Sequence, residues 1–287
     1  MTLLLALLLI SDLERAVADL KAGRLAEAQA ALETIAQREP SSADVLFYLG
    51  IARLQSGHPD TAIQPLTRAS VLAPGRAALW KALGISHSAL GNLTAAEAPF
   101  RQACELDSAN ELACYSYARN LQAQNRFEPA IAAFRRALTH ERKQNHWLVR
   151  RGLALALEAH ADVSAAEREF REAARLMPER VRPEDDPRTD YGAFLFRQGR
   201  AQEAVAPLEA AAAAHPASAS AHFHLARVLV QLNRLGAAAV HLEAAVKADP
   251  KHHAAHLLLG QAYTRLGRKQ DGAKHLRIGA AGAAESK

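Results

Sequence analysis

The sequence is short of the residues and motifs on which most enzymes and disulfide-stapled proteins depend. Its 287 residues include only two cysteines, and aromatic residues make up 5% of the chain. It contains no GxxxxGKS/T phosphate loop, no HExxH zinc motif, and neither a CxxC nor a GxSxG sequence. No strand is predicted, so we expect no attached α/β catalytic domain. We therefore expect a protein that is not an enzyme and that holds no cofactor.

Neither sign of charge dominates the chain. Lys and Arg number 35 and Asp and Glu number 30, which leaves a net charge of +5, and both signs are interspersed. With charged residues at 23%, the composition is not that of a disordered chain. A basic excess this small does not by itself indicate nucleic-acid binding, so we expect no nucleic-acid partner.

Long hydrophobic runs are also absent. The longest, MTLLLALLLI at residues 1–10, is shorter than the roughly 20 residues that span a bilayer. It could be the apolar region of a signal peptide, although no Lys or Arg precedes it and no small-x-small cleavage site follows before Glu14. It could equally be the start of a first helix that continues into Leu13 and Val17. We favour a cytoplasmic location, with export or membrane association if residues 1–10 act as a signal.

What the chain does have is a helical hairpin, most clearly at residues 43–74. Two short amphipathic helices are predicted there, because apolar residues recur at spacings of three and four. Gly57, next to Pro59, separates the two helices, and Pro74 ends the second. A single hairpin of this kind cannot bury its apolar face alone and needs neighbours.

The hairpin recurs at a nearly fixed interval along the chain. Equivalent ends lie at Pro40, Pro74, Ser108, Arg142, Pro178, Pro216 and Pro250, which differ by 34, 34, 34, 36, 38 and 34 residues. The predicted turns lie at Gly23, Gly57, Gly91, Asn125, Ala161, Gly199, Asn233 and Gly267. Glycine and asparagine tolerate the positive φ that such a turn requires.

A code of small and large residues accompanies the interval. A small residue is expected where the two helices of a hairpin approach closely, and a large one where neighbouring hairpins meet. The small residues in the first helices are Gly50, Gly84, Ala118, Ala154, Gly192, Ala226 and Gly260. Those that begin the second helices are Ala28, Ala62, Ala96, Ala130, Ala166, Ala204, Ala238 and Gly272. The large residues are Leu32, Leu66, Phe100, Phe134, Phe170, Leu208, Leu242 and Leu276.

This pattern resembles the tetratricopeptide repeat family, which has a period of about 34 residues. The best match is residues 77–108, where Trp80, Leu83, Gly84, Ala96, Phe100 and Ala103 stand on the family's signature positions. The resemblance implies an all-α, right-handed superhelical solenoid of about eight hairpins over residues 11–280. Residues 281–287 are then a short tail, too short for a capping helix.

Two junctions depart from the regular interval. Near residues 143–154 the phase slips by two residues, with Gly152 in the old register and Ala154 in the new one, so we expect a slightly longer helix. Residues 179–188, ERVRPEDDPR, carry prolines on both sides of an acidic triplet and predict an exposed loop. A tolerated insertion is the favoured interpretation of this loop, and a hinge or binding loop is the alternative.

Two sets of residues suggest further chemistry. Cys104 and Cys114 lie at the end of one hairpin and the start of the next, so they could pair, but we favour two small buried thiols. His252 and His256 are four residues apart, a spacing that can chelate a metal on a helix. No cysteine or Glu-His pair supports a site there. His256 also occupies the same repeat position as His222, so repetition of the hairpin explains its presence. We expect no metal.

The resemblance also implies a binding groove, lined by first-helix residues that face away from the second helices. On this sequence they are Phe47, Tyr48, Ile51, Lys81, Ile85, Tyr115, Arg119, Gln122, Arg151, Phe223, His224, Arg227 and Gln261. Aromatic and arginine side chains are the types enriched at binding hot spots. Alternatively, several of them only pack between hairpins. Ile85 and Ser116 stand where the family's chaperone-tail clamp needs asparagine, so we do not expect that clamp.

Taken together, the sequence predicts a non-enzymatic scaffold or adaptor that binds a protein or peptide segment in this groove. Tyr115, Arg119 and Arg151 suit an acidic or carboxylate-bearing segment, through forked hydrogen bonds and stacking. One alternative is a regulatory or substrate-recruiting subunit of an enzyme or of an export or assembly complex. An RNA-binding helical repeat is disfavoured by the strict interval and the modest charge.

Overall fold

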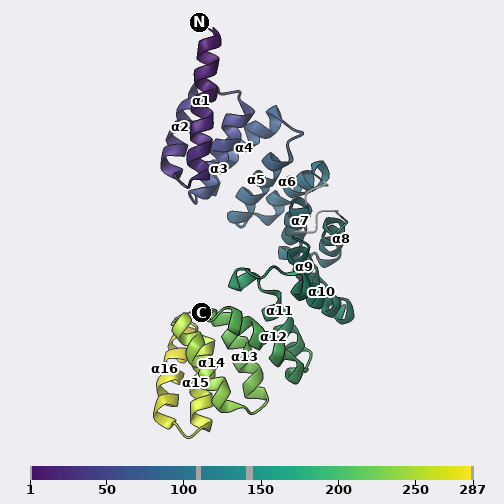
Figure 1. Cartoon of the computed structure of the whole chain (residues 1–287), viewed down its shortest axis with the longest axis vertical. Coiled ribbons are helices and arrows are strands. Elements are labelled where there is room, and N and C mark those ends of the chain that lie inside the picture. The colour runs from purple at the N-terminus through teal and green to yellow at the C-terminus, as the bar shows by residue number, and fades with distance from the viewer. Residues whose placement is uncertain (1, 108–110, 140–144, 286–287) are drawn as a thin grey trace. The chain divides into compact units, whose positions relative to one another are not determined.

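A computed structural model describes residues 2–107, 111–139 and 145–285 (Figure 1). Within these ranges the chain forms 16 α-helices and one 3-10 turn, and no strand, so the predicted all-α fold is confirmed. Within the two units, contacts join an odd-numbered first helix to the even-numbered second helix that follows it in the hairpins α1–α2, α3–α4, α5–α6, α7–α8, α11–α12, α13–α14 and α15–α16. Two of the predicted repeat ends, Ser108 and Arg142, lie outside the described residues.

The chain divides into two compact units, Met1–Val163 and Ser164–Lys287. The helices of the first unit are α1 (Thr2–Lys21), α2 (Leu25–Arg38), α3 (Ala43–Gln55), α4 (Pro59–Leu72), α5 (Ala77–Ala89), α6 (Leu93–Leu106), α7 (Glu111–Ala123), α8 (Phe127–Ala137) and α9 (His146–Ala159). Those of the second are α10 (Val163–Leu176), the 3-10 turn η1 (Pro183–Asp185), α11 (Pro187–Arg197), α12 (Ala201–Ala214), α13 (Ala219–Gln231), α14 (Leu235–Ala248), α15 (His253–Arg265) and α16 (Lys269–Glu285).

The turns inside the hairpins have the backbone conformation that the sequence predicts. All eight predicted turn residues have positive φ, between 58° at Asn125 and Asn233 and 81° at Gly267. A Cβ atom at Gly199 would meet no atom within 4 Å, so the backbone conformation alone favours glycine there. Ala161, at φ 66°, is the one turn residue that is neither glycine nor asparagine.

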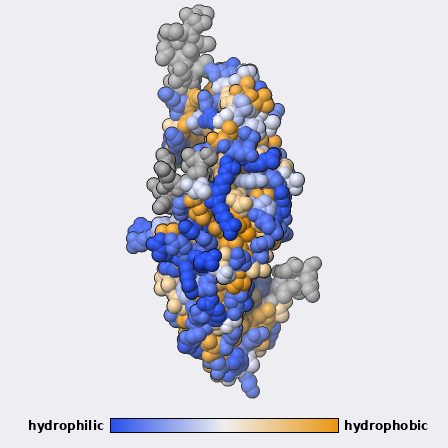
Figure 2. Space-filling model, turned by 90° about the vertical axis from the view of Figure 1, so that its right-hand side faces the viewer, coloured by the Kyte–Doolittle hydropathy of each residue, from blue (hydrophilic) through white to orange (hydrophobic). Residues whose placement is uncertain are grey.

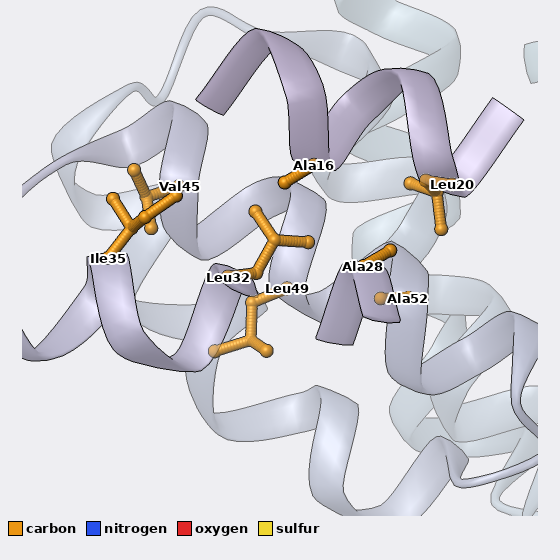
Figure 3. Close-up of a cluster of buried hydrophobic side chains, with 8 residues drawn as sticks. All are labelled: Ala16, Leu20, Ala28, Leu32, Ile35, Val45, Leu49 and Ala52. Carbon is orange, nitrogen blue, oxygen red and sulfur yellow. The ribbon is translucent and has the colours of Figure 1, made fainter. Parts of the chain in front are cut away.

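The small and large positions form the core of each hairpin. Ala96 is fully buried whereas its neighbour Ala95 is exposed. A Cβ atom on Gly84 would lie 2.6 Å from the ring of Phe100, closer than real Cβ contacts come, so only glycine fits there. The other alanines that begin second helices are buried as well: Ala28, Ala62, Ala130, Ala166, Ala204 and Ala238. Figure 3 shows one such core, in which Ala28 and Leu32 of α2 pack with buried side chains of α1 and α3.

The first irregular junction has a packing reason. α9 has 14 residues, one more than α3, α5 or α7. Gly152 does not simply continue the old register, because a Cβ atom there would meet Phe134 of the preceding hairpin at 2.6 Å and Tyr115 at 3.3 Å. The glycine therefore lets α9 approach the previous hairpin closely. Ala154, which carries the new register, is fully buried.

The loop at residues 179–188 is only partly the exposed insertion that the sequence predicts. Residues 179–180 and 182–184 are exposed, but Asp186 is 1% exposed. Its carboxylate caps α11 by accepting from the Arg188 backbone N–H at 2.9 Å, and it pairs with the Arg188 guanidinium at 2.6 Å. These hydrogen bonds and the charge of Arg188 hold the pKa of Asp186 below its usual value although burial raises it. The loop thus ends in a buried helix cap, which its proline and charge content did not indicate.

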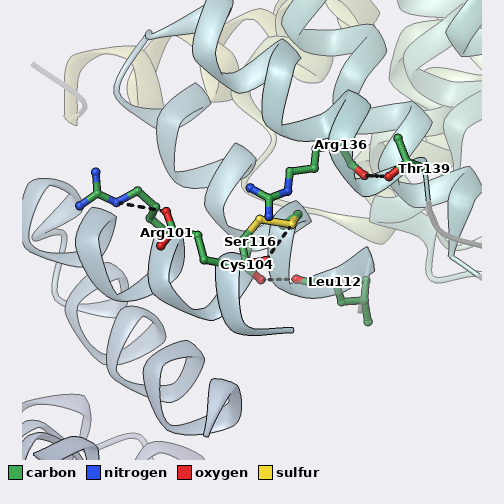
Figure 4. The surroundings of a disulfide bond; sticks show 8 residues. Arg101, Cys104, Leu112, Ser116, Arg136 and Thr139 are labelled. Carbon is green, nitrogen blue, oxygen red and sulfur yellow. Dashed lines mark hydrogen bonds and ion pairs between the residues drawn. A yellow bond between two sulfur atoms is a disulfide. The ribbon is translucent and has the colours of Figure 1, made fainter. Parts of the chain in front are cut away.

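The preference for two buried thiols is wrong. Cys104 at the end of α6 and Cys114 on α7 form a disulfide, with Cα atoms 4.4 Å apart, and both side chains are buried (Figure 4). Their separation of ten residues gave the possibility of a pair but not its geometry. The bond ties the second helix of one hairpin to the first helix of the next.

Both ends of the chain are helical, and the C-terminal end is more so than predicted. α1 begins at Thr2, so the apolar run is helical, and no helix in the described residues is long and apolar enough to cross a membrane. α16 continues to Glu285 instead of ending near Gly279, so most of the expected tail is helical. Gly279 and Gly272 permit close contact with α15, because Cβ atoms there would lie 2.9 Å from the backbone oxygens of His253 and Gly260.

Candidate peptide-binding surface

The predicted groove residues lie on the first helices, at fixed positions around the small residue of each helix, and all but Phe47 are half-buried or exposed. In the second unit, α13 contacts both α11 and α15, so consecutive first helices lie side by side. Between them is an open hollow of about 400 Å³. It is lined by Phe196, Phe223, Arg227, Val230, Gln231, Ala254, Leu257, Leu258 and Gln261. We call this the α11–α13–α15 hollow.

Three predicted residues, Phe223, Arg227 and Gln261, line this hollow, and sequence reasoning missed the other six. Several of them occupy repeat positions equivalent to those of predicted groove residues. Leu257 and Leu258 stand one repeat after Phe223 and His224, and Phe196 stands on the repeat position of Gln122. Extending the same register to every hairpin would have found these apolar lining residues.

Arg227 is the one charged residue among those that line the hollow. Its guanidinium carbon lies 4.9 Å from the ring centre of Phe196 and 5.8 Å from that of Phe223, which is cation–π geometry. The side chain is half-buried, and in the described part of the chain it forms neither an ion pair nor a hydrogen bond. By contrast, Arg200 is bound by both Glu167 and Glu203. A half-buried guanidinium group held by two aromatic rings is prepared to bind an anionic group.

The electrostatic surroundings of the hollow are positive. Burial, followed by the nearby charges of Arg227, Arg197 and His252, lowers the pKa of His224 to about 4. His224 is therefore neutral at neutral pH. Its neighbour Phe223 lies with its ring centre 4.5 Å from that of His252, the residue that precedes α15. Arg227 and Arg197 are both cationic, so an anionic ligand is favoured here.

In the first unit, the equivalent position is covered. Phe47 occupies the repeat position of Phe223, but it is 9% exposed and packs in the core with Leu66 and Leu83. The Arg76 guanidinium carbon lies 4.1 Å from its ring centre and is held by Asp44 at 2.5 Å. The structure therefore places Phe47 between hairpins rather than on an open surface.

Other predicted residues of the first unit line two further hollows. Tyr48 borders one of about 440 Å³ between α1 and α3, with Leu13, Val17 and Lys21 among its neighbours. Ile51 and Ile85 border another of about 520 Å³ between the α3–α4 turn and α5. Lys81 is half-buried, and burial lowers its pKa while Asp107 opposes that shift.

Two of the three side chains of the predicted acidic-segment site contact each other. Arg119 donates from Nη1 to the Tyr115 hydroxyl at 3.0 Å, and its guanidinium carbon lies 5.8 Å from that ring's centre. Arg119 is exposed, whereas Tyr115, Gln122 and Arg151 are half-buried. The close approach of Gly152 to Tyr115 brings the middle of α9 beside Tyr115. No described contact joins Arg151 to Arg119.

The two histidines considered for metal binding have separate roles. His252 Nδ1 accepts from the backbone N–H of Ala255 at 3.3 Å, and so caps α15. His256 instead faces His275, with their Nδ1 atoms 2.9 Å apart. Among the described residues, no group of three or more His, Cys, Asp or Glu side chains could hold a metal ion.

Comparison with known protein families identifies the repeats. A family model described as tetratricopeptide repeat matches residues 13–77, 49–111 and 115–180, which together exceed half of the chain. A second model, described as anaphase-promoting complex, cyclosome, subunit 3, matches residues 197–277. No curated protein sequence matches the chain.

Solved structures show the same fold. A tetratricopeptide repeat protein from Parabacteroides merdae ATCC 43184 is 16% identical, with a TM-score of 0.67 over 88% of this chain and 98% of that one. The APC/C hetero-tetramer Cut9-Hcn1 gives 16% identity and a TM-score of 0.63 over 91% of this chain, which spans 50% of that one. Pseudomonas aeruginosa pilF gives 18% identity and a TM-score of 0.52, covering 83% and 90% of the two chains. Identities this low establish likeness of fold only.

Proposed function

The chain belongs to the tetratricopeptide repeat family, and on that premise we propose that it is a non-enzymatic adaptor that binds a segment of another protein on its first helices. The observation that carries the proposal is the α11–α13–α15 hollow with Arg227 in its lining. Apolar side chains line most of it, and its one half-buried guanidinium group has neither an ion pair nor a hydrogen bond among the described residues. Burial of an apolar surface supplies affinity, and the arginine selects for charge.

The segment that fits this hollow has apolar side chains and an acidic residue or a terminal carboxylate. Its carboxylate would form a forked pair with Arg227, and its apolar side chains would cover Phe223 and Leu257. Arg227 is already held by two aromatic rings, so little side-chain entropy is lost when a ligand binds. Tyr115, Arg119 and Arg151 are proposed as a second acidic-segment site in the first unit, on the strength of the Arg119–Tyr115 hydrogen bond.

Binding of a peptide library tests the site in the second unit. The full chain and an Arg227→Gln variant are assayed by fluorescence anisotropy against peptides that pair apolar residues with acidic or basic ones. Arg277→Gln serves as the matched control, because Arg277 is an exposed arginine of the same unit on the second helix α16. We expect acidic peptides to lose at least about fivefold in affinity with Arg227→Gln, the effect of a hot-spot residue, and to bind the control as tightly as the unaltered chain.

Two outcomes would contradict the proposal. One is a preference for basic peptides, and the other is equal binding of acidic peptides to both variants. Arg119→Gln tests the first unit in the same assay. If Arg119 serves binding, affinity falls while the melting curve barely moves; if it is structural, stability falls instead.

A further inference from the structure

Two histidine pairs of the same geometry lie in consecutive hairpins of the second unit. His222 on α13 faces His241 on α14, with their Nδ1 atoms 3.0 Å apart. One repeat later, His256 on α15 faces His275 on α16 at 2.9 Å. The rings are stacked in both pairs, with centres 5.2 Å and 5.1 Å apart. Each pair therefore joins the first and second helix of its hairpin.

Hydrogen bonding fixes where the protons lie. Nε2 of His222 is 3.1 Å from the Pro216 carbonyl oxygen, and Nε2 of His256 is 3.2 Å from that of Pro250. A carbonyl oxygen only accepts, so each Nε2 must carry a hydrogen. The Nδ1 atoms of the neutral His222 and His256 are then acceptors, and His241 and His275 must donate to them from Nδ1.

This arrangement limits how many protons each pair holds. A first additional proton can bind at Nε2 of His241, because the hydrogen bond between the two rings is kept. A second would have to bind at Nδ1 of His222, where two N–H groups would then face each other at about 3 Å between two cationic rings. An unfolded chain has no such limit, since both histidines titrate freely near their ordinary pKa. The folded pair thus excludes one proton that the unfolded chain binds.

The charges around the pairs do not remove this limit. Glu209 on α12 acts on His241, and Glu243 on α14 acts on His275 together with Asp271 and Lys274 on α16. The pKa values of His241 and His275 are both lowered, first by burial and then by the partner histidine. The carboxylates act in the opposite direction without reversing the shift.

We propose that the two histidine pairs make the hairpins α13–α14 and α15–α16 an acid-sensitive section of the protein, which opens on acidification below the ordinary histidine pKa. For each pair that excludes one proton, the opening equilibrium shifts by about tenfold per pH unit in that range. The α11–α13–α15 hollow depends on α13 and α15, so acid would also release a bound segment. That consequence rests on the proposed function, whereas the acid sensitivity does not.

A double variant, His241→Asn with His275→Asn, tests the proposal. The asparagine amide can donate to the facing histidine or, when rotated, accept from it, so the pair no longer excludes a proton. Hydrogen exchange of α13–α16 is followed from about pH 7.5 to about pH 5.5 and corrected for the intrinsic exchange rate. We expect protection of the unaltered chain to fall about tenfold further than in the double variant for each pair broken on opening. His58→Asn, at an exposed histidine of the first unit, should leave the fall unchanged.

An equal fall in the double variant and the unaltered chain would overturn the proposal, whatever the outcome of the peptide assay. A second measurement does not depend on any variant. Ring ¹⁵N shifts near neutral pH should show the Nδ1–H tautomer at His241 and His275 and the Nε2–H tautomer at His222 and His256. The Nε2–H tautomer at all four would equally refute it, because no proton would then be shared between the rings.

Discussion

Ala161 is the place where a single substitution should stabilise the fold. It occupies a turn in which five of the other seven residues are glycine and two are asparagine, and its φ is 66°. The side chain is exposed, so removing its methyl group gives up little packing. Ala161→Gly therefore changes the backbone energy of one residue and little else.

The magnitude follows from two opposing effects. An L-residue in the left-handed region costs about 1–2 kcal/mol, which glycine does not bear. Glycine also increases the conformational freedom of the unfolded chain, which costs about 0.4–1 kcal/mol. We expect a net gain of about 0.5–1 kcal/mol in the free energy of unfolding of the section that contains this turn.

Urea denaturation followed by circular dichroism measures this gain, together with hydrogen exchange of α9, which ends just before the turn. The matched control is Gly199→Ala, the reverse change at an equivalent turn with φ 75° and no atom within 4 Å of the added Cβ. It should lose a similar amount. If Ala161→Gly is neutral or destabilising while Gly199→Ala is harmless, positive φ is not what selects these residues.

Three further outcomes are expected. Ala96→Leu should destabilise by about 1–3 kcal/mol in urea melts and Ala95→Leu by much less, because only the first is buried at a close helix contact. Gly272→Ala should destabilise, since its Cβ would lie 2.4 Å from a threonine oxygen, whereas Gly236→Ala, with open space around it, should stabilise by about 0.5–1 kcal/mol. His224 has a folded pKa of about 4 against 6.5 unfolded, so it contributes stability above pH 6.5 that is lost as the pH falls towards 4. His224→Gln should therefore remove about 3 kcal/mol of the acid loss seen in melts across that range.

The repeat code was readable from the sequence because each of its positions depends on local physics. Turn residues such as Asn125 and Asn233 are chosen by φ, and Ala96 is chosen by the space between two helices. Both constraints repeat in every hairpin, so the same residue types recur at the same interval and the repeat can be recognised from the sequence. The code does not specify the surface residues. Figure 2 shows that hydrophilic and hydrophobic residues are interspersed over the surface in view.

The candidate site was less predictable, because it depends on neighbours that differ between repeats. Phe47 and Phe223 occupy the same register, yet Arg76 covers the first ring while the second borders an open hollow. Asp186 looked like part of a solvated acidic loop, and its burial depends on the pairing with Arg188. Such pairings are set by tertiary contact, which the repeat interval does not encode.

The disulfide between Cys104 and Cys114 links the stability of the first unit to its chemical surroundings. A covalent link across ten residues lowers the conformational entropy of the unfolded chain. This raises the free energy of unfolding by about 2–3 kcal/mol. That contribution is present only where the redox poise keeps the pair oxidised, as in secretory or periplasmic surroundings, and thiol buffers of a reducing cell interior remove it. The link between α6 and α7 is thus weaker in one compartment than in another, although no residue differs. Trapping the thiols at the moment of cell lysis would reveal in which of the two states the protein works.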